Sequence, residues 1–112
     1  MKGNHLGEFE ELVLLMVGVL FDNAYGVTVT EEIEKQTERA VSLSAVHTAL
    51  YRLEEKGFIK SALGGATQER GGRRKRMYTI TAAGKATLNE VRLMRNRLWD
   101  LIPHTSFNFG QS

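Results

Sequence analysis

The spacing of apolar and polar residues predicts helices in the first half of the chain. Residues 8–20 carry an apolar band that is too wide for a helix with one buried side, so we expect this helix to be buried on two sides. A turn follows, and residues 27–39 predict a second helix, with Val27 and Ile33 facing inward and most acidic side chains outward.

The third predicted helix, residues 43–56, has the clearest pattern. Ser42 or Ser44 can cap its N-terminus, and Gly57 can end it. Its apolar residues follow the spacing of three and four that places them on one helix face. These residues are Leu43, Val46, Leu50 and Leu53.

Two short strands and a last helix complete the pattern. Residues 58–63 and 77–81 alternate as strands do, and the glycines between them favour an antiparallel hairpin with a long tip. Thr81 can cap a helix over residues 82–102 that ends before Pro103, with Gly84 as a local weakness.

Length and composition indicate one domain. The chain has 112 residues with ordinary hydrophobic and charged fractions, and we divide it into residues 6–81, a helix 82–102 of the same compact unit, and a tail 103–112 that we expect to be flexible. Without cysteine it can form neither disulfides nor thiolate metal sites, which suits a reducing cytoplasm. We expect neither a signal peptide nor a transmembrane helix, because the longest apolar stretch is about half the roughly 20 residues that a span needs.

Candidate residues for catalysis do not converge in the sequence. His5, His47 and His104 are too far apart to form a paired metal-ligand motif, and no phosphate-binding loop occurs. We therefore predict a protein that is not an enzyme and that holds no metal and no cofactor.

Charge is distributed unevenly between the two halves of the chain. Residues 1–55 hold four basic and ten acidic residues, and residues 56–112 hold eleven basic and three acidic ones. The second half could therefore face a polyanion, although two solvated faces would give the same counts.

Three helices followed by a hairpin are the layout of a winged helix-turn-helix, in which the third helix enters the DNA major groove. We thus predict an α+β fold, mostly α, with three helices, a two-stranded wing and a C-terminal dimerisation helix. The outward face of residues 43–52 has short polar side chains and no acid, and residues 70–76 hold five basic residues and two glycines, as a wing that contacts phosphates needs.

Several segments together resemble the PadR family of transcriptional regulators. They are LGE at 6–8, AYG at 24–26, VSL at 41–43, LYRLEEKGFI at 50–59, GGRRKRMY at 71–78 and TITAAG at 79–84. The resemblance implies a homodimeric repressor on a palindromic operator, with Ser44, Thr48 and Tyr51 reading DNA. His47 stands where family members often have tyrosine. Because the chain continues little beyond its last predicted helix, we do not expect an elaborate effector pocket.

These interpretations define two sets of candidate residues. The candidate DNA contacts are Ser42, Ser44, His47, Thr48, Tyr51, Arg52, Lys60, Arg70, Arg73, Arg74, Lys75 and Arg76. The candidate dimer contacts are Phe9, Leu12, Val13, Leu88, Val91, Leu98, Trp99 and Ile102.

Two alternatives stay open from the sequence. The third helix or basic wing could bind a protein or an RNA in place of duplex DNA. Trp99 could stack on a small aromatic effector or serve as an anchor of the dimer interface.

Overall fold

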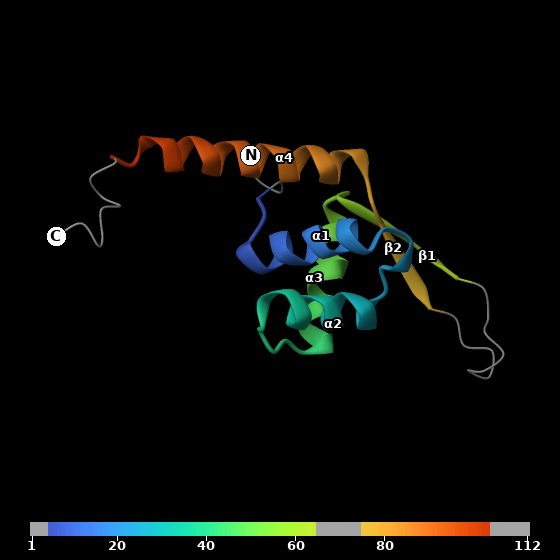
Figure 1. Ribbon diagram of the computed structural model, residues 1–112. Coiled ribbons are helices and arrows are strands. Elements are labelled where there is room, and N and C mark those ends of the chain that lie inside the picture. Colours follow the sequence, from blue (N-terminus) through green and yellow to red (C-terminus); the bar gives the residue numbers. More distant parts are fainter. Residues whose placement is uncertain (1–4, 65–74, 104–112) are drawn as a thin grey trace.

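The computed structural model describes residues 5–64 and 75–103, which form a mostly helical winged helix with an added C-terminal helix (Figure 1). The predicted fold class is confirmed. In chain order the elements are α1 (Glu8–Leu20), η1 (Phe21–Asn23, a 3-10 turn), α2 (Gly26–Thr37), α3 (Leu43–Glu55), β1 (Ile59–Leu63), β2 (Arg76–Ile80) and α4 (Ala82–Leu101).

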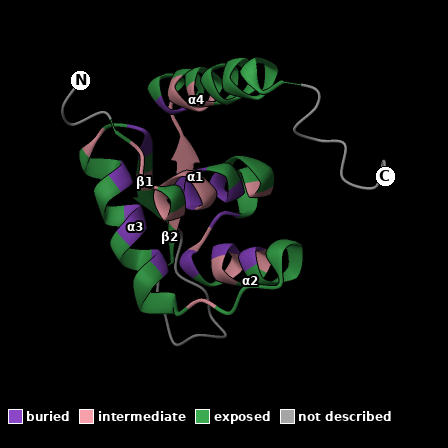
Figure 2. Ribbon diagram, turned by 90° about the vertical axis from the view of Figure 1, so that its left-hand side faces the viewer, coloured by how far each residue is buried: buried purple, intermediate pink, exposed green. Residues whose placement is uncertain are grey.

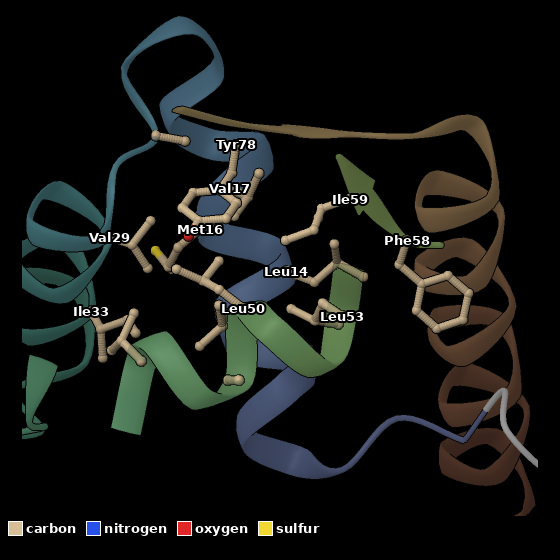
Figure 3. Packing of buried hydrophobic residues seen from close by; sticks show 14 residues of the cluster. Leu14, Met16, Val17, Val29, Ile33, Leu50, Leu53, Phe58, Ile59 and Tyr78 are labelled. Atoms are coloured by element: carbon tan, nitrogen blue, oxygen red, sulfur yellow. The ribbon is translucent and has the colours of Figure 1, made fainter. Parts of the chain in front are cut away.

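The hydrophobic core lies among the first three helices and the inner face of the hairpin (Figure 3). Burial of these apolar side chains supplies most of the free energy that holds the helices together. No polar or charged residue among those described is fully buried. The largest fully buried side chains are Leu14, Ile33, Leu50, Leu53, Ile59, Val13, Val17, Val29 and Val46.

Local hydrogen bonds set where the helices begin and end. Of the two candidate caps of α3, Ser42 is the one used, since its Oγ accepts a 3.0 Å hydrogen bond from the backbone N–H of Ala45. Helix α2 ends at Thr37, two residues before its predicted end, because Glu38 adopts a left-handed conformation with φ of 58°.

The hairpin pairs Ile59 with Ile80 and Leu63 with Arg76 in antiparallel register. Thr81 follows the second strand instead of extending it, and its side chain accepts a hydrogen bond from the backbone N–H of Gly84 as the predicted N-cap of α4. The backbone N–H of Thr81 donates to the carbonyl oxygen of Phe58 at 3.0 Å. A single residue thus joins the wing to α4.

The predicted inward faces were partly wrong. Val27 is 53% exposed, and the buried residues of α2 are Val29 and Ile33, which are four residues apart and so lie on one face. Leu43, the first residue of α3, is 42% exposed. Helix α1 is not buried on two sides, because Leu15 and Val19 are exposed.

Helix α4 is buried only near its beginning, although farther along the Nη2 of Arg95 donates to the Oε1 of Glu11 on α1 at 3.3 Å. Gly84 is the sole buried residue of α4, and a Cβ at this position would overlap the carbonyl oxygen of Phe58. Gly84 is therefore required for close packing, which corrects the expectation that it is only a weak point. Figure 2 shows the exposed surface that covers most of α4.

Candidate nucleic-acid interface

Helix α3 has an exposed outward face (Figure 2), and most of the residues on it are polar, as the sequence predicted. Val46, Leu50 and Leu53 fix its inner side to the core with no exposed surface. The exposed side chains include Tyr51, which is 64% exposed. The candidate contacts that α3 and its cap expose are Ser42, Ser44, His47, Thr48, Tyr51 and Arg52.

Two hydroxyls on this surface already serve the helix. The Oγ of Ser42 holds the cap, and the Oγ1 of Thr48 donates a 3.0 Å hydrogen bond to the carbonyl oxygen of Ser44. The Thr48 oxygen keeps lone pairs for a donor from outside, and Thr48 as a residue is exposed. Thr48 can thus accept a hydrogen bond or make an apolar contact.

The hairpin adds positive charge beside α3. Lys60, Lys75 and Arg76 are exposed at the described part of the wing. The Nζ of Lys75 lies 5.3 Å from the centroid of the Tyr25 ring, a cation–π contact that restrains the side chain. The candidate contacts Arg70, Arg73 and Arg74 lie outside the described residues.

A chain of hydrogen bonds ties the wing to α3, and no pattern in the sequence predicts it. The Nη1 of Arg76 donates to the Oγ of Ser61 at 2.9 Å, and that hydroxyl donates to the Oε2 of Glu54 at 2.8 Å. Arg76 is therefore held in place before any ligand arrives.

Burial raises the pKa of the nearby Tyr78 phenol. The Arg76 charge opposes this shift, and the Glu54 charge adds to it.

The acidic residues at the start of α1 are paired with basic side chains. The Oε2 of Glu8 lies 2.8 Å from the Nη1 of Arg39, and the Oε1 of Glu10 lies 2.6 Å from the Nζ of Lys56. These pairs reduce the negative field near Arg52, which lines a shallow recess with Glu8 and Glu10.

A second surface lies between α1 and α4, away from α3. A groove of about 670 Å³ runs between the two helices and is lined by Leu15, Leu88, Arg95 and Trp99, among others. Of the candidate dimer contacts, Leu98, Trp99 and Ile102 are exposed, whereas Phe9, Leu12, Leu88 and Val91 are half-buried.

Val13 differs from the other candidate dimer contacts. It has no exposed surface in the single chain and belongs to the core, so it has no surface to offer a partner.

The described residues form neither a metal-binding cluster nor a single membrane-spanning helix. Across residues 5–64 and 75–103, no three histidine, cysteine, aspartate or glutamate side chains gather closely enough to hold a metal ion. Over the same ranges, no single helix is long and apolar enough to cross a membrane. Residues 8–23 and 26–37 are long and apolar enough only when taken together, and the two segments are bent by 119° relative to each other.

A comparison with protein-family models decides the family. Residues 14–90 match the model of the transcriptional regulator PadR-like family, which is more than half of the chain. The chain belongs to this family. Members of the PadR family regulate transcription and are not enzymes, in agreement with the sequence prediction.

Solved structures of PadR proteins share the fold. A PadR family regulator from Clostridium difficile R20291 is 29% identical, with a TM-score of 0.66 over 84% of this chain and 92% of that one. A PadR-like transcription factor from Bacteroides fragilis is 20% identical, with a TM-score of 0.69 over 82% and 84% of the two chains. Bacillus subtilis PadR, solved in complex with operator DNA, is 21% identical, with a TM-score of 0.61 over 87% of this chain and 51% of that one. A search of curated proteins found no match.

Proposed function

We propose that this PadR-family protein is a homodimeric repressor that binds a palindromic operator through α3 and the wing. The observation that carries the proposal is the outward face of α3, which exposes small polar side chains and Tyr51 without an acidic residue between Leu43 and Leu53. A helix that enters the major groove needs such a face, because carboxylates there would repel the phosphates.

The residues of this surface divide into two roles. The side chains of Ser44 and Thr48 are short, so the helix can approach closely enough for them to contact base edges. Tyr51 can donate a hydrogen bond to a phosphate without adding charge. Lys60, Lys75 and Arg76 stand at the base of the wing, where cations neutralise the DNA backbone. Arg70, Arg73 and Arg74 extend this set by sequence.

A second copy of the chain is the proposed partner of α4. Its outer half exposes Leu98, Leu101 and Ile102, and α1 exposes Leu15 and Val19 beside the groove. Apolar surface on this scale commonly marks an interface. A two-fold dimer would place two α3 helices roughly 34 Å apart, one turn of DNA, and would therefore favour a palindromic site.

The proposal is tested by selection from a randomised palindromic duplex pool, with a scrambled pool as control and several salt concentrations. Enrichment of a two-fold symmetric site, bound less tightly as salt rises, is the expected result. Equal weak binding to both pools would contradict the proposal and turn attention to a protein or RNA partner. A reporter gene placed behind the selected site then distinguishes repression from activation.

An effector site at Trp99 is a separate question. Trp99 lines the groove and is 61% exposed, so a flat aromatic molecule has an indole to stack on. An interface anchor would use the same exposed ring. Titration of its fluorescence with a panel of aromatic compounds separates the two, because an anchor alone gives no response to the panel.

Such a regulator would act in the cytoplasm. A chain without cysteine has no disulfide to lose in that reducing compartment.

A further inference from the structure

A recess of about 400 Å³ opens beside α3 where three elements meet. Tyr25 and Gly26 lie at the start of α2, His47 lies on α3, and Lys75 and Arg76 lie at the start of β2. The recess borders the outward face of α3, because His47 is exposed and lies one helical turn from the exposed Tyr51.

The His47 ring rests directly on the backbone of α2. A Cβ built on Gly26 would lie 2.7 Å from the Cε1 and 2.8 Å from the Nε2 of this ring, distances that real side chains do not adopt. Gly26 is buried, and its missing side chain is what admits the ring. The position of the His47 ring on α3 therefore depends on the absence of a side chain at Gly26 on α2.

Among the described residues that line the recess with His47, the charged groups are cations. Lys75 and Arg76 come from β2, Tyr25 contributes a phenol from the start of α2, and the described lining of the recess contains no carboxylate. Behind Arg76, the hydroxyl of Ser61 links the guanidinium to the carboxylate of Glu54. The described part of the recess is thus positively charged.

A phosphate group is the ligand that would change this balance. Its charge would offset Lys75 and Arg76, and an imidazolium can donate a charge-assisted hydrogen bond to it, whereas the neutral ring gives a weaker one. Histidine is the side chain whose charge ordinarily changes between about pH 5 and 8.

We propose that His47 is a proton-dependent contact to a phosphate of the DNA backbone, held in this recess by Gly26. The inference rests on the proposed DNA-binding function and adds a regulation to it. Because the phosphate favours the protonated ring, DNA binding takes up a proton at His47. By linkage, affinity rises as the pH falls and declines as the pH rises.

The experiment is an anisotropy titration of the full chain with its selected duplex at constant ionic strength, from pH 6.0 to 8.5. For the natural protein we expect affinity to fall by about tenfold between pH 6 and pH 8. His47→Gln should bind at every pH about as the natural protein does at pH 8.5. The matched control is His5→Gln, at an exposed histidine outside the recess, which should keep the full pH dependence.

Each other outcome has a definite meaning. An unchanged pH dependence in His47→Gln, or none in the natural protein, overturns the proposal and leaves DNA binding in place. No duplex binding at any pH overturns the proposed function instead.

Gly26→Ala gives a second readout that does not alter the histidine. The added methyl group would displace the flexible ring, so we expect a reduced pH dependence with unchanged helix content by circular dichroism. A full pH dependence in folded Gly26→Ala would contradict the role assigned to Gly26. If this variant does not fold, His47→Gln still decides the proposal.

Discussion

The Nζ of Lys56 lies 2.6 Å from the Oε1 of Glu10 and ties the end of α3 to the first turn of α1. Both side chains are largely buried, and the same ammonium donates to the carbonyl oxygen of His5 at 2.6 Å. The segment before α1 is thereby held against the end of the helix that we propose reads DNA.

Removal of one partner should cost stability. Glu10→Ala leaves the Lys56 ammonium half-buried without its carboxylate, and we expect the free energy of unfolding to fall by about 1–3 kcal/mol. Chemical denaturation measures this change. Glu8→Ala is the control, because its pair with Arg39 is exposed and should contribute less than about 1 kcal/mol. Equal losses in the two variants would contradict the importance of burial here.

Two helical glycines should respond to alanine in opposite directions. Gly84→Ala forces a methyl group against the carbonyl oxygen of Phe58, and overpacking of this kind costs about 1–3 kcal/mol. Gly18→Ala meets nothing within 4 Å and should stabilise α1 by up to about 1 kcal/mol. Thermal unfolding of both variants tests this; a Gly84→Ala variant as stable as the natural chain would show that α4 can shift freely.

Thr48 should affect which sequences are bound. Thr48→Ala removes the hydroxyl that the outward face of α3 offers, and we expect preference among operator variants to change by about 1–3 kcal/mol at one base-pair position. Thr48→Ser, which keeps the hydroxyl, should restore part of the preference. Uniform weakening over all sequences would instead assign Thr48 to the backbone.

The wing arginines should affect all sequences alike. Arg73→Ala or Arg74→Ala should weaken binding without regard to sequence and reduce the slope of log K against log salt by about one for each lost phosphate contact. Arg97→Ala, on the exposed part of α4, is the control and should leave the slope unchanged. An unaltered slope in the wing variants would remove them from the interface.

The exposed apolar side of α4 should control assembly. Leu98 is 51% exposed, and Leu98→Asp would place a charge in the proposed dimer seam. We expect sedimentation equilibrium to show a shift from dimer to monomer and loss of tight operator binding. Ala40→Asp, in the exposed turn between α2 and α3, should remain dimeric. A natural chain that sediments as a monomer would refute the seam.

The sequence pattern predicted the elements well because spacing along one helix decides them. The stripe Val46, Leu50 and Leu53 was correct, and so was the cap at Thr81. Leu43 was wrong because the first residue of a helix lies at the rim of the core. Val27 was wrong because it precedes Ile33 by six residues and so lies on another helix face, whereas the buried Val29 precedes Ile33 by four.

Contacts between distant segments could not be predicted in the same way. Gly26 against the His47 ring, and Gly84 against the Phe58 carbonyl, depend on how closely two elements approach. In the sequence, Gly84 looks like a helix weakness and Gly26 like part of a turn. The link from Arg76 through Ser61 to Glu54 depends likewise on the strand register and on the rotation of α3.

The joint at Thr81 bears on how the regulator would tolerate operators of different lengths. The backbone N–H of Thr81 donates to the carbonyl oxygen of Phe58, and the hydroxyl of Thr81 donates to the carbonyl oxygen of Gly57 at 2.7 Å. These two hydrogen bonds restrict movement between the wing and α4. In a dimer built on α4, each α4 helix would hold its own wing and α3 at a fixed distance from those of the partner subunit. An operator with one or two base pairs added between its half-sites would then bind poorly, because the two α3 helices could not move apart to reach both half-sites.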